Sequence, residues 1–256
     1  MAVLKSVALA FSMFSRIPMP NVRMTDENMR YMMCAFPLVG AVVGLAIWGW
    51  CALCASLGLG ELLRAGGLTV IPIAVTGGIH LDGLCDVSDA LASNSDAARR
   101  REILKDPHTG AFAVIWCVCY ILLYFALSAE LTFRAADTVI LCLTFVLSRA
   151  LSAYAVLMFP QSQGTGLSAS FSASAAMPLS RVILRGIIVL CAAAMALAEP
   201  VRGCAAVAAA ILCHMYLYFT ARRKFGGMSG DLAGWFLQIC ELAVLAVLVA
   251  ARHILL

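Results

Sequence analysis

The run DTVILCLTFVLSRALSAYAVLMF, residues 137–159, contains a single charged side chain, Arg149, after its first residue. About 20 consecutive apolar residues suffice to cross the hydrocarbon core of a bilayer as an α-helix. The whole chain has the same character: 63% of its 256 residues are hydrophobic, only 12% are charged, and the mean hydropathy is +0.95. This composition lies far outside the range of soluble globular proteins and predicts an integral membrane protein.

Apolar segments of similar length recur along the chain, separated by charged residues and by Pro and Gly. We predict seven membrane-spanning helices, because lipid offers backbone groups no partner outside a helix or a closed barrel. They cover residues 31–57, 68–92, 110–129, 137–159, 182–198, 203–221 and 231–253. The shorter apolar run 3–15 ends at Arg16 and is followed by Pro18, so we expect an interfacial helix there and no signal peptide. The predicted fold class is all-α: a polytopic integral membrane protein with about seven transmembrane helices and an interfacial N-terminal helix, in one domain covering residues 1–256.

The Lys and Arg residues divide unevenly between the two sides of this topology. One side carries 13 of the 18 and the other side carries four, while Arg149 lies inside a span. The 13 are Lys5, Arg16, Arg23, Arg30, Arg99, Arg100, Arg101, Lys105, Arg181, Arg185, Arg222, Arg223 and Lys224, and the four are Arg64, Arg134, Arg202 and Arg252. Cytoplasmic loops are enriched in these residues, so we expect the first set and the N-terminus to face the cytoplasm across the inner membrane. The net charge of +4 follows from this topology and does not indicate nucleic-acid binding.

Three carboxylates occur close together in GGIHLDGLCDVSDAL, residues 77–91. On a helix, Asp82, Asp86 and Asp89 fall within roughly 60° of one another and therefore share a face. Each Asp at membrane depth costs about 2.5–3.5 kcal/mol on insertion scales, so a compensating partner is expected. Mg²⁺ is suitable, because it takes oxygen ligands from carboxylates, phosphates and water. The alternative is a solvated acidic face on a surface helix, which should show charges of alternating sign.

Glycines and a histidine accompany these aspartates. Gly77 and Gly78 weaken the helix in mid-span, and Gly83 leaves space beside Asp82 through which a bulky substrate can approach. His80 is a candidate base, although on a regular helix it points nearly opposite Asp82. Proton transfer and plain packing therefore both remain open for His80.

Two more polar groups lie further along the chain. In REILKDPHTGAF, the turn signature DPHTG is expected to hold Lys105 and Asp106 where they can contact a diphosphate and complete a metal shell. In the last span, Asp231 and Glu241 share a helical face, and Asp231 is either a ligand or an ordinary helix cap. Glu241 lies well inside an apolar helix, where an ionisable group is a functional candidate. We expect Arg149 to pair with Glu241, to face a substrate phosphate, or to snorkel to the cytoplasmic end.

Four stretches resemble the adenosylcobinamide-GDP ribazoletransferase family, also called cobalamin 5'-phosphate synthase. They are FSMFSRIPMP, GGIHLDGLCDVSDAL, REILKDPHTGAF and GGMSGDLAGWFLQICEL, and they occur in the family order along the whole chain. The resemblance implies an enzyme that joins adenosylcobinamide-GDP to α-ribazole or its 5'-phosphate and releases GMP, with Mg²⁺ as cofactor. A lipid bilayer is the expected surrounding, no nucleic acid is expected as a partner, and a homo-oligomer is compatible with the sequence.

The resemblance also implies roles for individual residues. The implied catalytic residues are Asp82, His80 and Lys105; the substrate-binding residues are Arg16, Arg101 and Arg149; the metal ligands are Asp82, Asp86, Asp89, Asp106, Asp231 and Glu241. We expect the three polar groups to converge on one cytoplasm-facing cavity at the membrane boundary, because clustered carboxylates and a diphosphate need the same cations. The cavity should be wide and partly apolar, since a corrinoid is large.

Two other function classes fit parts of the sequence. A cation-coupled transporter also buries acidic residues, but it should show repeated halves, and we find none. Another membrane phosphoalcohol transferase, acting on a CDP-alcohol, shares the carboxylate chemistry but usually carries D-x-x-D-G-x-x-A-R, which is absent. The 11 cysteines are scattered through apolar spans, where thiols behave as small hydrophobes.

Overall fold

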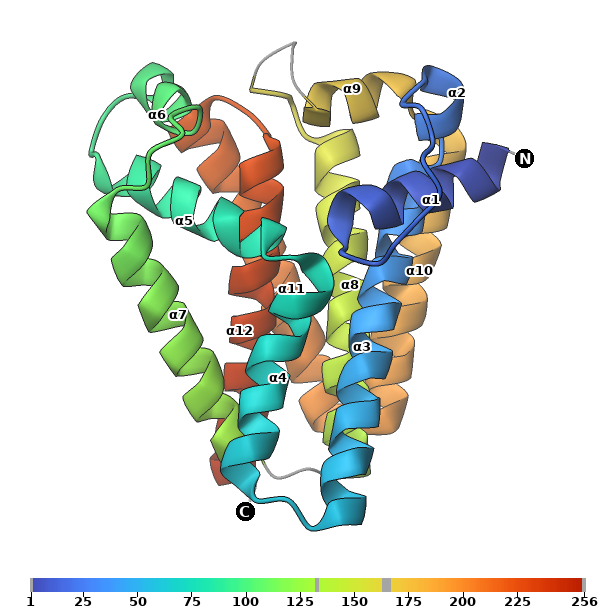
Figure 1. Cartoon of the computed structure of the whole chain (residues 1–256), viewed down its shortest axis with the longest axis vertical. Helices are drawn as coiled ribbons and strands as arrows, with labels where there is room; N and C mark the ends of the chain where they lie inside the picture. The colour runs from blue at the N-terminus through green and yellow to red at the C-terminus, as the bar shows by residue number, and fades with distance from the viewer. Residues whose placement is uncertain (1, 132–133, 163–166, 255–256) are drawn as a thin grey trace.

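The computed structural model describes residues 2–131, 134–162 and 167–254 and is built of helices (Figure 1). The helices are α1 (Ala2–Phe14), α2 (Asp26–Met29), α3 (Met32–Leu57), α4 (Glu61–Thr76), α5 (Ile79–Ala92), α6 (Ala97–Ile103), α7 (Ala111–Glu130), α8 (Ala135–Met158), α9 (Leu167–Ser174), α10 (Met177–Ala198), α11 (Pro200–Thr220), the π-helix η1 (Ala221–Phe225) and α12 (Gly230–Ile254). The predicted all-α class is confirmed.

Six of the described helices are long and apolar enough to cross a membrane, namely α3, α7, α8, α10, α11 and α12. A seventh span is reached if α4 and α5 are counted together. The predicted number of about seven spans therefore agrees with the structure. A short apolar helix is also present at the N-terminus, and this helix, α1, lies at one end of the bundle against α3 (Figure 1).

The predicted span 68–92 is not one continuous helix. Gly77 and Gly78 have φ angles of +67° and +80°, a left-handed conformation that favours glycine, and their N–H groups close the end of α4. The chain bends there by 94°, so that α5 runs across the end of the bundle (Figure 1). We therefore treat α4, whose 16 residues cover roughly 24 Å, as the spanning part, and α5 as a helix outside the spans.

The centre of the bundle is formed by α8 and α12, which are the most deeply buried spans. Helix α3 packs on α8 through two small residues one turn apart, Gly40 and Gly44. A Cβ at Gly44 would lie 2.8 Å from the backbone oxygen of Cys142, so only glycine permits this approach. Small residues at such spacing are typical of helix packing in membranes.

The two ends of the bundle differ in charge. Helices α1, α2, α6 and α9 lie together at one end, which also receives the basic segment 222–224 of η1 (Figure 1). At the other end, the buried Asp137 carboxylate accepts two hydrogen bonds from Arg202, at 2.7 and 2.8 Å. The predicted separation of basic loops from the sparsely charged side is thus present in the fold.

Candidate active site

A cavity of about 170 Å³ opens beside the first turn of α5. Its wall is mostly apolar and comes from α1, α3, α5, α8, α9 and α12. The lining residues include Phe14, Phe36, Ala153, Val156, Phe171 and Leu237. Three chemically active side chains join them: His80, Asp82 and Asp231. The cavity therefore combines an apolar interior with two carboxylates.

Asp82 and Asp231 approach each other because α5 packs directly on α12. A Cβ on Gly83 would lie only 2.7 Å from the backbone oxygen of Asp231. Gly83 thus admits the neighbouring helix, and the sequence-based expectation that it admits a substrate is not supported. The predicted convergence of the second and last segments is confirmed for these two aspartates.

Asp231 is not the residue that caps α12. The Ser229 hydroxyl accepts a hydrogen bond from the Leu232 N–H at 3.3 Å, and the Ser229 carbonyl accepts one from Ala233. Ser229 therefore supplies the cap that the sequence suggested for Asp231. This leaves the Asp231 carboxylate to face the cavity, which it lines.

His80 is buried, with 4% of its surface exposed, although Asp82 two residues later is exposed. Its ring lies 5.7 Å from that of Phe36 and 6.4 Å from that of Phe14, measured between centroids. Within the described part of the chain, its Nε2 atom has no hydrogen-bond partner. The expected opposite orientation of His80 and Asp82 does not separate them, because the cavity extends around the start of α5 and both residues line it.

Asp86 lies one turn further along α5 and is half-buried. Burial raises the pKa of the Asp86 carboxyl to about 6, and the charges of Asp82 and Asp231 add to this effect. Among the described residues, no three His, Cys, Asp or Glu side chains form a ready-made metal site. The carboxylates nevertheless fit Mg²⁺, which commonly uses one or two protein carboxylates together with substrate phosphates and water.

Asp89 occupies the far end of the same helical face and has a structural contact. Its carboxylate accepts hydrogen bonds from the backbone N–H groups of Gly110 and Ala113, at 2.6 and 2.9 Å. It therefore caps the first turn of α7. The sequence placed Asp89 with the metal ligands, whereas the structure turns both of its oxygens toward α7.

The DPHTG turn lies beside Asp89 and lines a separate, open hollow of about 510 Å³. Asp106 accepts hydrogen bonds from the backbone N–H and the Nδ1 atom of His108, at 3.0 and 2.7 Å. These contacts lower the pKa of the Asp106 carboxyl, the backbone hydrogen bond most strongly. Lys105 precedes it with an exposed side chain. The predicted group of Lys105 and Asp106 thus does not share the cavity of Asp82 and Asp231.

Two predicted substrate-binding arginines lie at the same end of the bundle. The Arg16 side chain covers Gly77 at the bend between α4 and α5. Gly77 and Asp82 line the same surface hollow. Arg101 donates to the Phe225 carbonyl at 2.9 Å and so fastens α6 to η1. Arg100, which the sequence did not single out, is buried and donates to the Lys224 carbonyl at 3.3 Å.

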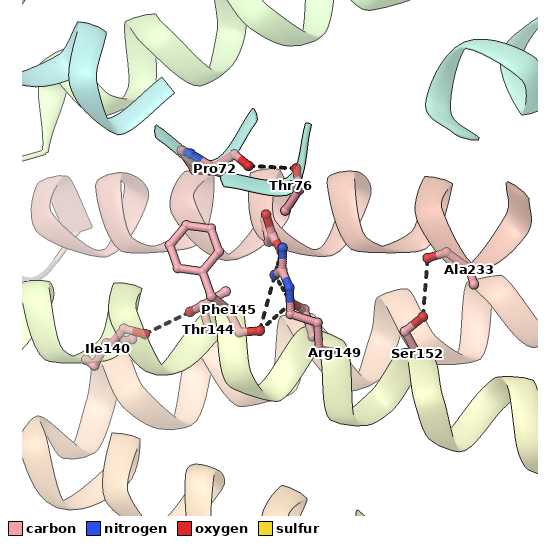
Figure 2. Close-up of polar contacts among 10 residues, drawn as sticks. Pro72, Thr76, Ile140, Thr144, Phe145, Arg149, Ser152 and Ala233 are labelled. Atoms are coloured by element: carbon pink, nitrogen blue, oxygen red, sulfur yellow. Dashed lines mark hydrogen bonds and ion pairs between the residues drawn. The ribbon is translucent and has the colours of Figure 1, made fainter. Parts of the chain in front are cut away.

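Arg149 and Glu241 form an ion pair in the interior of the bundle, as expected from the sequence. Figure 2 shows Arg149 on α8 turned toward α12. Its Nη1 atom also donates to the Phe145 carbonyl at 3.2 Å, and the Ser148 hydroxyl donates to the Glu241 carboxylate at 3.0 Å. Neither Arg149 nor Glu241 lines the cavity of Asp82, so the structure separates them from the proposed ligand set.

Asp82 also lines a second hollow of about 350 Å³, formed by the bend between α4 and α5 together with Cys117 of α7. The carboxylate thus stands between an apolar cavity and an open surface depression. The expectation of a wide cavity is wrong, because about 170 Å³ is smaller than an ordinary drug-sized pocket of about 300–1,000 Å³.

Comparisons with known proteins identify the family of the chain. Residues 6–249 match the family model described as Cobalamin-5-phosphate synthase. The chain is 42% identical to an adenosylcobinamide-GDP ribazoletransferase of Lachnoclostridium phytofermentans, over 96% of this chain and 94% of the relative. Proteins of the same name from Stutzerimonas stutzeri and Clostridium perfringens are 34% and 30% identical, each over 93% of this chain and 94% of the relative. No solved structure matches the chain.

Proposed function

The chain belongs to the cobalamin-5-phosphate synthase family and carries adenosylcobinamide-GDP ribazoletransferase activity in cobalamin biosynthesis, and we propose that Asp82 and Asp231 form the centre of its active site. The reaction joins adenosylcobinamide-GDP to α-ribazole or α-ribazole 5'-phosphate and releases GMP. The whole chain, residues 1–256, acts as one membrane-embedded domain.

The chemistry is a phosphoryl transfer with a defined exchange of bonds. The ribose 3'-oxygen of the acceptor forms a bond to the phosphorus next to cobinamide, and the bond from that phosphorus to the bridging diphosphate oxygen breaks. GMP leaves with the bridging oxygen, and the hydroxyl proton passes to a protein group or to solvent. Such a transfer depends mainly on positioning and on neutralising the charge of the phosphates.

The observation that carries this assignment is the approach of Asp82 and Asp231 across the α5–α12 contact. Two helices that are far apart in the sequence bring carboxylates to the wall of one cavity. Like charges close together are unfavourable unless a cation joins them. Burial raises the pKa of Asp86, and the neighbouring charges of Asp82 and Asp231 raise it further. A diphosphate substrate brings the same need for a cation.

Mg²⁺ is the proposed cofactor, held by Asp82 and Asp231 with support from Asp86. When bound, it neutralises the diphosphate and orients the phosphorus that is attacked. Mg²⁺ commonly takes its remaining ligands from substrate phosphates and water, and the diphosphate of the donor would supply them here. Arg16 and Lys105, at the same end of the bundle, are proposed to contact the diphosphate. Asp89, Asp106, Arg101 and Glu241 have structural partners and are assigned to supporting the site.

The active site is proposed to face the cytoplasm. The elements around Asp82 belong to the end of the bundle that carries the larger set of Lys and Arg residues. Positively charged loops favour the cytoplasmic side. Both nucleotide-type substrates would then reach the site directly from the cytoplasm.

GMP release tests the assignment. Purified protein is supplied with adenosylcobinamide-GDP and α-ribazole, with Mg²⁺ or with EDTA. GMP should appear only when both substrates and Mg²⁺ are present, and Asp82→Asn and Asp231→Asn should each slow it by about 100-fold or more. Full activity in EDTA would show that the reaction does not need Mg²⁺. Full activity in both variants would show that Asp82 and Asp231 are not at the centre of the active site.

A further inference from the structure

The apolar cavity behind Asp82 has a composition that phosphate chemistry does not explain. A diphosphate needs cations and donors, whereas the walls beyond the carboxylates are built from Phe14, Phe36 and Phe171. One buried polar atom points to a missing partner: His80 Nε2 has no hydrogen-bond partner among the described residues. A buried nitrogen left unpaired costs free energy, which a ligand that bonds to it would recover.

We propose that this cavity binds the flat, apolar aromatic base of the ribazole acceptor, with His80 Nε2 donating a hydrogen bond to the unsubstituted ring nitrogen of that base. This inference rests on the proposed function and assigns the cavity to one of its two substrates. His80 is then a substrate-binding residue, and the hydroxyl proton goes elsewhere.

Volume supports an aromatic ring system as the occupant. The cavity measures about 170 Å³, and an apolar protein cavity of about 150 Å³ is known to accept benzene. A flat base of the benzimidazole type is larger than benzene and would occupy more of a space of this size. The corrin ring of the donor is far too large and remains on the open side of Asp82.

Polarity separates the acceptor base from the guanine of the donor. Guanine presents several donors and acceptors along its edges, and each needs a partner when it is buried. Among the described residues, the polar side chains of the wall besides the two carboxylates are His80, Ser152 and Ser168. The Ser152 hydroxyl already donates to the Ala233 carbonyl at 3.4 Å. A base with one free ring nitrogen can be satisfied by His80 alone. A buried guanine edge would leave several polar groups without hydrogen-bond partners.

The arrangement also places the reacting atoms. With the base against the aromatic walls of the cavity, its ribose extends toward Asp82 and Asp231, which line the same cavity. The 3'-hydroxyl then meets the diphosphate at these carboxylates. The donor can approach from the other hollow that Asp82 lines, at the α4–α5 bend. Asp82 therefore stands between the acceptor side and the donor side.

Direct binding of α-ribazole tests this without turnover. The full chain, purified in detergent and kept in EDTA, is titrated with α-ribazole, and binding is followed by the fluorescence of the base. Ala153 is fully buried and lines the cavity, so Ala153→Leu should fill it and weaken α-ribazole binding about tenfold or more. Ala206→Leu is the control, because Ala206 is equally buried but lies on α11 outside the cavity. Its affinity for α-ribazole should match that of the wild type.

His80→Phe tests the hydrogen bond separately from the shape. The wild type should bind α-ribazole about tenfold more tightly than the matching indole riboside, which lacks the ring nitrogen. His80→Phe keeps an aromatic ring beside Phe14 and Phe36, so it should bind the two ribosides equally. The loss of discrimination is a result that a merely structural role would not produce.

Outcomes for the cavity and for the proposed function can be told apart. The cavity assignment is overturned if Ala153→Leu binds α-ribazole with wild-type affinity, or if it loses affinity for guanosine nucleotides instead. GMP release by the wild type would be unaffected by either result. If Ala153→Leu does not fold, Val156→Ala provides a second test. It shortens a side chain in the wall and so enlarges the cavity, and it should bind a riboside with a bulkier base more tightly than α-ribazole. Unchanged selectivity in Val156→Ala would overturn the assignment as well. Absence of GMP release by the wild type contradicts the proposed function itself.

Discussion

Gly83 of α5 lies against the backbone of Asp231 in α12. A Cβ atom at Gly83 would lie 2.7 Å from the backbone carbonyl oxygen of Asp231. This contact brings the two carboxylate-bearing helices together. We expect Gly83→Ala to push α5 away from α12, to destabilise the protein by about 1–3 kcal/mol and to slow GMP release about tenfold or more. Thermal unfolding in detergent and the GMP assay measure the two effects.

Gly186 provides the matched control for this prediction. It also lies within a helix, α10, but a Cβ there meets nothing within 4 Å. Gly186→Ala should therefore leave the activity unchanged and stabilise the helix by up to about 1 kcal/mol. Equal behaviour of the two variants would show that the close contact at Gly83 is unimportant.

Asp82 and Asp89 share a helical face but should behave differently when replaced. Asp89 caps the start of α7, so Asp89→Ala should cost about 0.5–2 kcal/mol of stability and leave the Mg²⁺ concentration for half-maximal activity unchanged. Asp82→Ala should abolish turnover while the protein stays in the membrane. A shifted Mg²⁺ requirement in Asp89→Ala would return Asp89 to the ligand set.

The Arg149–Glu241 pair predicts a strong dependence of each residue on the other. Removing one partner leaves a charge buried, so Arg149→Leu and Glu241→Gln should each destabilise the protein by about 3–5 kcal/mol. The double variant should recover most of that loss. Wild-type stability in both single variants would mean that the pair does not hold α8 to α12, and an inactive but fully stable Arg149→Leu would favour a role at the substrate phosphate.

Single-cysteine labelling tests the orientation of the site. In a background with the native cysteines replaced by serine, a cysteine at Ser95 or Ser229 should react with a membrane-impermeant maleimide only after the cells are opened. Ser56 lies near the end of α3 at the other side of the bundle and is exposed, so a cysteine there should react in intact cells. The reverse pattern would place the active site outside.

The sequence predicted the spans well because their signal is local. A run of about 20 apolar residues identifies a membrane helix without reference to the rest of the chain. The approach of Asp82 to Asp231 was also predictable, since isolated carboxylates near a membrane need a shared neutralising partner. The Arg149–Glu241 pair follows from the same reasoning, because a buried cation requires an anion.

Other features depend on tertiary contacts that no local pattern reveals. The double glycine at 77 and 78 indicated a weak point, but the 94° bend and the placement of α5 across the bundle require the surrounding helices. Asp89 accepts from backbone groups 21 and 24 residues away, so its capping role cannot be recognised from helical spacing. The apolar cavity has no sequence motif, because its walls come from six separate helices.

The most direct test of the central claim is the Mg²⁺ dependence of GMP release in carboxylate variants measured side by side. Asp82→Asn and Asp231→Asn are compared with Glu102→Gln, an exposed carboxylate paired with Arg99 at 2.8 Å. We expect both aspartate variants to lose about 100-fold or more in rate and to need more Mg²⁺, while Glu102→Gln stays within about twofold of the wild type. Wild-type rates at wild-type Mg²⁺ concentrations in Asp82→Asn and Asp231→Asn would contradict a metal-assisted transfer at these two residues.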